Sequence, residues 1–329
     1  MHHRNRRVGL AIACMGMLLQ AAQVLAQQSA DQAVPAEPAA AEFELVQAGE
    51  NPETRRYAFE VGQDVTLHIV NDVQMKMDMG FGLQGQPLPT SEQYISMRVV
   101  EVDDDGVASV RMVIERARVT PGQEVDPFLR DAIEEGLAPY RGIQARFKLD
   151  TRGQTSDEVV TDADGMPLVN PEIRQSMEET MKASGVALPV EPFGAGAVWI
   201  QRETVSINGV TMLRESTHTV ESIEGDTMIV RSDVKVSAEP HFVENDMLAP
   251  GMRLRLDGTN MTGSGRSVFS LAGLETSLDV TTSGDVNMTV FQNGEEIAMH
   301  QWISMAMTAE SHDGPLPDAD DGAPDGPGF

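Results

Sequence analysis

The feature that most constrains the fold is a regular alternation of apolar and polar residues between Val65 and Met79. The apolar members occupy odd positions: Val65, Leu67, Ile69, Val73, Met75, Met77 and Met79. Successive side chains of a β-strand point to opposite faces, so this pattern predicts a strand with one apolar and one polar face. Such a strand packs one face on a core and leaves the other in water. At about 3.3 Å per residue it would span roughly 50 Å, so we expect a bend or bulge within it.

The same alternation recurs in four later stretches, over residues 107–119, 143–149, 228–236 and 297–307. Asn208-Gly209 and Asn293-Gly294 lie between alternating segments, and Asn-Gly is the strongest short signal for a hairpin turn. Glycine-containing acidic turns at 103–106, 164–165 and 224–225 indicate further reversals. The predicted fold class is mainly β (α+β): a long-stranded antiparallel curled sheet or half-barrel, with two short helices inserted mid-chain.

Both helices are expected near the middle of the chain. The first lies near residues 126–138, where Asp126 can cap and Pro127 can occupy the first turn. The second lies near residues 171–184, with Asn170 as its cap. Its apolar stripe has the helical spacing of one packing face and consists of Ile173, Met177 and Met181.

The first 26 residues have the composition of an export signal. Basic residues precede an apolar run from Val8 to Leu25, and small residues lead to a predicted cleavage after Ala26. We therefore expect a periplasmic or secreted protein with no transmembrane anchor after cleavage. Cys14 lies inside the apolar run rather than at its end, which disfavours lipidation but leaves it open.

Composition divides the remaining chain into three parts. Residues 27–42 are rich in Ala, Gln and Pro and read as a disordered linker, and residues 311–329 read as a disordered acidic tail. Residues 43–310 form a single β-rich domain. Val100-Glu101 and Val220-Glu221 begin similar segments 120 positions apart, which suggests two related halves at about 43–160 and 190–310.

Charge and cysteine content exclude some classes of protein. The chain has 51 acidic and 24 basic residues and a formal net charge of −27, which opposes binding to nucleic acid and to anionic membranes. Cys14 is its only cysteine, so the core has to hold the domain without disulfides.

Motifs with catalytic or cofactor spacing fail on their surroundings. Gly80, Gly82 and Gly85 match a dinucleotide fingerprint, but the following Pro87 prevents the helix that this motif must open. We therefore predict no cofactor and no catalytic residues, and favour a non-enzymatic role. The many carboxylates leave open an acid–base pair that sequence spacing does not reveal.

Methionine is the unusual component, at 20 residues. Flexible thioethers fill irregular cores, and they also suit a surface that holds a greasy ligand. The predicted ligand-facing residues are Met75, Met77, Met79, Met299, Met305 and Met307. The alternative is a Cu(I) site, because thioether sulfur binds this ion. Its candidate residues are His300, Trp302, Met305 and Met307, although alternation places the first two on the opposite strand face.

Two short motifs carry a resemblance to a family. Residues 188–199 read LPVEPFGAGAVW, and Gly263-Ser264-Gly265 is followed by Phe269, Leu271 and Gly273-Leu274. These resemble an uncharacterised family of secreted bacterial proteins with no known activity. The predicted architecture looks like the half-barrel of periplasmic lipoprotein carriers. We therefore expect an exported envelope protein that binds a lipid or other hydrophobic ligand, or that has a structural or assembly role.

Overall fold

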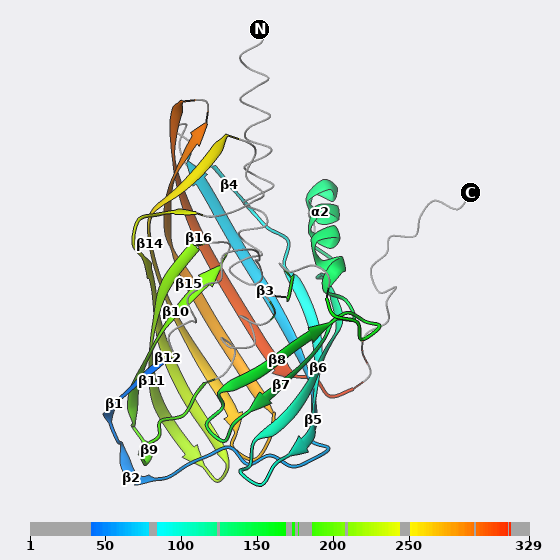
Figure 1. Cartoon of the computed structure of the whole chain (residues 1–329), viewed down its shortest axis with the longest axis vertical. Helices are drawn as coiled ribbons and strands as arrows, with labels where there is room; N and C mark the ends of the chain where they lie inside the picture. The colour runs from blue at the N-terminus through cyan, green and yellow to red at the C-terminus, as the bar shows by residue number, and fades with distance from the viewer. Residues whose placement is uncertain are drawn as a thin grey trace, which may run out of the picture.

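The computed structural model describes residues 41–78, 84–123, 126–168, 173–174, 177, 186–207, 210–243, 251–292, 294–314 and 316 (Figure 1). The predicted fold class is confirmed, because strands dominate and most of them form one antiparallel sheet. No helix in the described ranges is long and apolar enough to cross a membrane. The first half contains β1 (Glu42–Gln47), β2 (Glu50–Glu53), β3 (Asp64–Asp78), β4 (Gln84–Pro87), β5 (Ser91–Val102), β6 (Ala108–Val119), α2 (Pro127–Leu137), a 3₁₀ turn (Ala138–Tyr140), β7 (Gln144–Leu149) and β8 (Thr155–Thr161). The second half contains β9 (Phe193–Ala195), β10 (Val198–Ile207), β11 (Val210–Glu224), β12 (Thr227–Ala238), β13 (His241–Val243), β14 (Met252–Ser270), β15 (Thr276–Gln292) and β16 (Glu295–Ser311).

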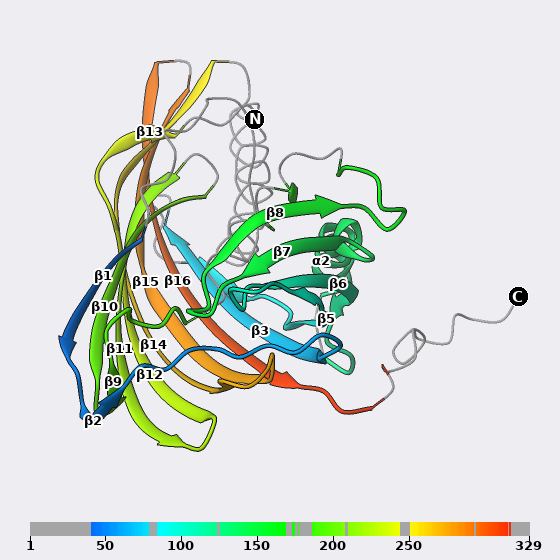
Figure 2. The same ribbon diagram turned by 60° about the horizontal axis from the view of Figure 1, so that its bottom comes forward.

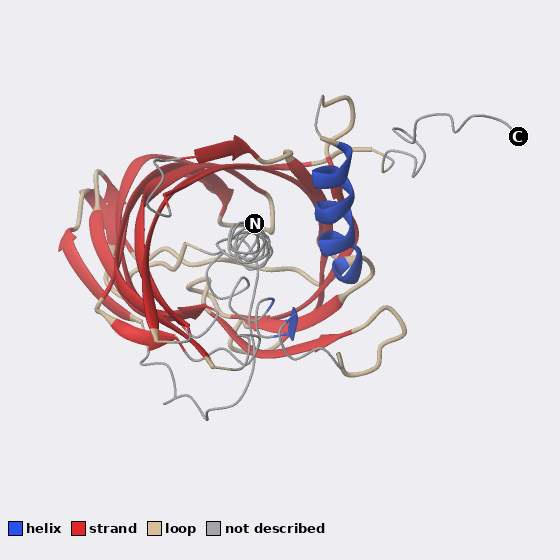
Figure 3. Cartoon of the chain, turned by 90° about the horizontal axis from the view of Figure 1, so that it is seen from above, coloured by secondary structure: helices blue, strands red, loops and turns tan. Residues whose placement is uncertain are grey.

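The large sheet has 14 strands, in the order β1-β10-β11-β12-β14-β15-β16-β3-β5-β6-β7-β8, with β13 beside β14 and β4 beside β3. The sheet is strongly curled, and its two edge strands are β1 and β8 (Figures 2 and 3). The segment that follows β2 and the segment that precedes β9 both contact the β7–β8 turn. There Tyr57 N donates to Thr151 O and Leu188 N donates to Arg152 O, each over 2.8 Å. Strands β2 and β9 form a separate two-stranded sheet.

The apolar face of the sheet points into the curl. In β16, Met305 pairs with Val73 of β3 and Met307 pairs with Asn71, so the odd positions of both strands share a face. Tyr57 packs against two core clusters, one on strands β5–β7 and one on the β10–β12 side of the sheet. These two parts of the sheet therefore direct their apolar faces toward the same interior. This apolar face is the concave face.

Strand β3 covers almost the whole predicted stretch, but the expected bulge is absent from its described pairings with β5 and β16. Glycines allow close approach of two other strands of the sheet, β14 and β15. A Cβ at Gly263 would lie 2.7 Å from the carbonyl oxygen of Thr281, and one at Gly284 would overlap the carbonyl oxygen of Asn260. Backbones approach this closely only where the side chain is absent.

Three separate clusters of buried side chains line the concave face. The first joins β5, β6, β7 and α2 and includes Ile114 and Leu137. The second surrounds Trp199 on the β10–β12 side of the sheet. The third lies at the end of the sheet that carries β13 and contains Leu256 and Met299.

The first predicted helix is confirmed as α2. Asp126 Oδ1 accepts a hydrogen bond of 2.9 Å from Phe128 N, and Pro127 opens the helix. Most of the predicted helix at 171–184 lies outside the described residues. Its described members Ile173, Arg174 and Met177 are helical, and both Ile173 and Met177 are buried.

The predicted acidic turns are present. In the β5–β6 turn Asp103 Oδ1 accepts from the backbone nitrogens of Asp105 and Val107, and Gly106 has a φ of 81°. Gly225 takes a φ of 60° at the β11–β12 turn. The Asn208-Gly209 turn and Asn293 lie outside the described residues.

The β5–β6 and β11–β12 hairpins share local structure. Val99 pairs with Val110 and Val220 pairs with Val230, and each pair is followed by a register shift. Val99 also exchanges backbone hydrogen bonds with Gly62 and Gln63, as Val220 does with Gly196 and Ala197. The structural equivalent of Val220 is therefore Val99, one residue before the Val100 of the sequence match.

Candidate functional site

The candidate site is the centre of the concave face. Between the three buried clusters, apolar side chains of several strands remain partly exposed. They come from β3, β12, β15 and β16 and include Ile69, Val73, Val234, Val280, Met305 and Met307. An apolar surface left partly open inside a curl is typical of a site for a hydrophobic molecule.

The structure places the predicted methionines on this face in two groups. Met75 and Met77 are partly buried against the third cluster, in which Met299 is 6% exposed. Met305 and Met307 lie further along β16 and are partly exposed. Met79 lies outside the described residues.

The third cluster also contains methionines that were not predicted to face a ligand. Met252 and Met288 belong to it, and Met288 is the direct cross-strand partner of Met299. The Asn293-Gly294 turn contained the signal for this pairing, because a two-residue turn sets which residues of β15 and β16 face each other.

A glutamine is buried among these apolar residues. Gln301 is 1% exposed and its Nε2 donates to the sulfur of Met75 over 2.6 Å. Its neighbours across the sheet are Val286 and Met77. The amide thereby finds a partner within an apolar cluster, as buried polar groups generally do.

A second group of polar side chains lies on the concave face of strands β10, β11 and β12. Trp199 of β10 pairs with His218 of β11, which pairs with Ser232 of β12. The Trp199 and His218 rings stack with centroids 5.1 Å apart, and His218 Nδ1 lies 2.8 Å from Ser232 Oγ. Trp199 is completely buried and His218 is 6% exposed.

Electrostatics keep His218 neutral at physiological pH. Burial first, and then the positive charge of Arg214, lowers the pKa of His218 from 6.5 to about 4. Arg214 lies four residues earlier on the same face of β11, where it forms an ion pair with Glu203 of β10. Sequence reasoning did not identify this group.

The residues of the copper alternative lie on two faces of β16. His300 Nε2 contacts Asp285 Oδ1 at 2.7 Å, and the ammonium of Lys76 lies 4.7 Å from the centre of the Trp302 ring. Met305 and Met307 are on the opposite, concave face. A site built from all four residues would need side chains from both faces of one strand. The described part of the chain also contains no group of three or more His, Cys, Asp or Glu residues placed to hold a metal ion.

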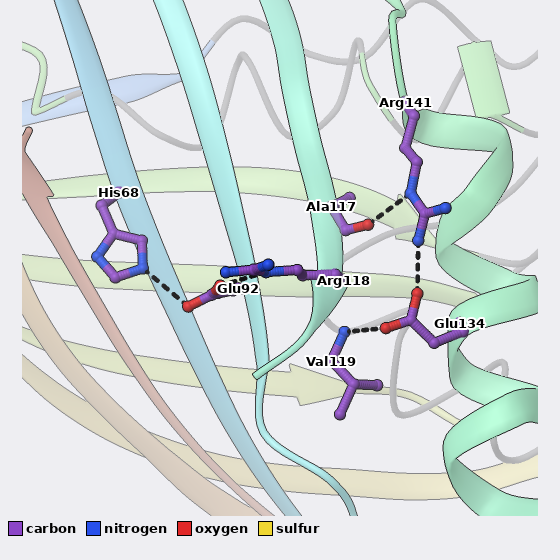
Figure 4. Close-up of polar contacts among 7 residues, drawn as sticks. All are labelled: His68, Glu92, Ala117, Arg118, Val119, Glu134 and Arg141. Carbon is purple, nitrogen blue, oxygen red and sulfur yellow. Dashed lines mark hydrogen bonds and ion pairs between the residues drawn. The ribbon is translucent and has the colours of Figure 1, made fainter. Parts of the chain in front are cut away.

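The outer face of β3, β5 and β6 carries a buried ionic contact (Figure 4). Glu92 lies between His68 and Arg118, at 3.3 Å from His68 Nε2 and 2.6 Å from Arg118 Nε. Tyr94 stacks on His68, and His312 packs against Tyr94 after β16 ends. The contact thereby joins three strands and the segment that follows β16, which is a structural role.

A neighbouring contact attaches α2 to the end of β6 (Figure 4). Glu134 of α2 accepts from Val119 N over 2.6 Å and from Arg141 over 2.5 Å. Arg141 also donates to the carbonyl oxygen of Ala117 over 2.7 Å. These bonds hold the helix against the apolar residues of the first cluster.

Comparisons with known proteins give no family for this chain. No protein-family profile matches, and a search of curated proteins finds no significant match. Among solved structures, a mutant of the Rh. blastica porin matches 76% of this chain and 100% of its own, at 10% identity and a TM-score of 0.21. Pseudomonas aeruginosa OpdO matches 76% of this chain and 98% of its own, at 8% identity and a TM-score of 0.17. Similarity at these scores carries no argument about this chain.

Proposed function

We propose that this protein binds an elongated hydrophobic molecule, such as a lipid, on the concave face of its sheet, without chemical conversion of that molecule. The observation that carries the proposal is that the buried core is divided into separate clusters. Three buried clusters are separated by a surface of partly exposed apolar side chains, which includes Met305 and Met307. Exposed apolar surface is costly in water, at about 25 cal/mol per Å². A ligand that covers it would recover that energy.

The methionines suit this task better than other apolar residues. Their unbranched side chains adopt many shapes, so a methionine-lined surface can fit apolar molecules of different outline. The outer face of the same strands is polar, with Asp72 and Lys76 on β3. Among the described residues of β3 and β16, the apolar side chains therefore lie mainly on the concave face.

We further propose that the protein works in the cell envelope or outside the cell. This rests on the signal-like composition of residues 1–26 and on the acidic composition of the chain. The mass of the protein recovered from an expressing bacterium tests it. A measured mass equal to that of residues 27–329 supports export, whereas a mass that still includes residues 1–26 contradicts export.

The binding proposal is tested with N-phenyl-1-naphthylamine, a neutral apolar dye that fluoresces when it leaves water. The full-length gene product, purified without detergent, should enhance its fluorescence in a saturable way. In a Met307→Glu variant a carboxylate enters the concave face, and the dye affinity should fall by roughly tenfold or more.

Thr308→Glu is the matched control. Thr308 follows Met307 on β16, but its side chain is exposed on the outer face. This variant should bind the dye like the unaltered protein. Equal losses in the two variants, or no saturable binding by the unaltered protein, would contradict the proposal.

A further inference from the structure

Trp199 and His218 together leave two buried polar atoms without a hydrogen-bond partner. These are Trp199 Nε1 and His218 Nε2, and neither has a partner among the described residues. Two such atoms in one stacked pair are unusual, because a buried polar group without a partner costs free energy that native structures avoid. Phenylalanine at either position would fill an aromatic site without this cost.

The chemistry of the two atoms defines what could satisfy them. An indole nitrogen can only donate a hydrogen bond. When the Ser232 hydroxyl donates to His218 Nδ1, the proton of the neutral imidazole lies on Nε2, which is then a second donor. The indole nitrogen of Trp199 therefore lacks a hydrogen-bond acceptor, such as an oxygen atom, and in this tautomer His218 Nε2 can donate to the same acceptor.

The surrounding charges favour a neutral acceptor. Arg214 is already paired with Glu203 on the same face, so the pair offers no free positive charge to an anion. His218 is uncharged at neutral pH for the reasons given above. An anionic group buried here would lose its hydration without gaining a counter-ion.

The next concave-face positions connect this pair to the partly exposed centre of the sheet. Ser232 pairs with Gly265 of β14, and Gly265 pairs with Val280 of β15. Ser232, Gly265 and Val280 are all partly exposed. Small residues therefore separate the buried pair from the apolar surface proposed to hold the ligand.

We infer that Trp199 and His218 form the polar recognition point of the ligand site, and that the ligand is an apolar chain carrying a neutral oxygen acceptor, such as a carboxylic ester. This inference rests on the proposed function and specifies its ligand. The apolar chain lies along the concave face, and the ester carbonyl accepts from Trp199 Nε1 and His218 Nε2.

The test compares two neutral probes, N-phenyl-1-naphthylamine, which lacks an oxygen acceptor, and methyl decanoate, which has an ester. Dye affinity is measured directly and ester affinity by displacement of the dye. Trp199→Phe removes the N–H and keeps an aromatic ring. It should weaken methyl decanoate binding by roughly five- to tenfold, the effect of one net hydrogen bond, and change dye binding less than about twofold.

His218→Phe is a second variant with the same expected selectivity, and circular dichroism verifies that each variant is folded. Decanoate should bind the unaltered protein more weakly than its methyl ester. Equal weakening of dye and ester in the variants, or unchanged ester binding, would overturn the inference while leaving hydrophobic binding intact. Failure of the unaltered protein to bind the dye or the ester would overturn both.

A fluorescence measurement tests the same point without a change at the site. The chain has two tryptophans, so Trp302→Phe on the outer face leaves Trp199 as the only one. Methyl decanoate should shift the Trp199 emission to longer wavelength, because its N–H gains an oxygen partner. An unchanged or blue-shifted emission at saturating ester would refute the contact.

Discussion

Burial of neutral His218 makes the stability of the protein depend on pH. The pKa of this histidine is about 4 in the folded chain and 6.5 as the ordinary value. Below pH 6.5 the unfolded chain takes up a proton that the folded chain refuses until about pH 4. The contribution of neutral His218 to the unfolding free energy is therefore fully present above pH 6.5 and is lost as the pH falls from 6.5 to about 4.

The magnitude follows from the width of that window. Each pH unit within it costs about 1.4 kcal/mol, so a fall from about pH 7 to about pH 5 removes about 2 kcal/mol through His218 alone. Other charged groups of the protein also contribute to its pH dependence. Their contribution cancels when the pH dependence of the unaltered protein is compared with that of a His218→Phe variant.

The assay is urea unfolding followed by circular dichroism at about pH 7 and about pH 5. Between these values the unaltered protein should lose about 2 kcal/mol more unfolding free energy than His218→Phe. Trp302→Phe, an aromatic substitution on the outer face, should retain the pH dependence of the unaltered protein. Parallel pH dependence in the unaltered protein and His218→Phe would refute the reasoning about the buried imidazole.

Three further predictions concern the scaffold, each measured as unfolding free energy in urea. Gly284→Val places a Cβ against the backbone of β14 and should destabilise by at least about 2 kcal/mol, whereas Ser283→Val on the outer face should cost much less. Asp126→Ala removes the cap of α2 and should cost about 1 kcal/mol; no loss would show that the cap is not formed in solution. Glu92→Gln replaces the charge that Arg118 contacts over 2.6 Å and should cost about 2 kcal/mol, and an unchanged stability would contradict its burial.

The strands were predictable where a single face is buried. Apolar residues alternate over most of the stretch from Val65 to Met79, and the structure forms β3 over Asp64–Asp78. Asp126 and Pro127 likewise predicted the start of α2, because a capping carboxylate and a first-turn proline both act locally. Local signals of this kind do not depend on the rest of the fold.

The order of the strands was not predictable from alternation. Strand β3 lies between β5 and β16, so the last strand of the chain pairs with one near its start. Alternation assigns the faces of each strand but does not specify its neighbour. Burial of the central β3 residues depends on this long-range pairing.

The Trp199–His218 pair could have been predicted from the sequence, but it was not. Asn208-Gly209 is predicted to be a two-residue turn. Ile207 pairs with Val210, and this register puts Trp199 directly opposite His218. A count outward from the turn would have found the pair. In contrast, the lack of hydrogen-bond partners for Trp199 Nε1 and His218 Nε2 depends on the packing of distant segments. It can be seen only in the structure.

We propose that the concave face holds a hydrophobic molecule. Native mass spectrometry of the full-length gene product, purified without detergent from its producing cell, tests it most directly against the denatured mass. We expect additional mass in the native spectrum that matches an apolar, ester-containing molecule and disappears on denaturation. A bare chain in the native spectrum that also takes up neither N-phenyl-1-naphthylamine nor methyl decanoate would contradict it.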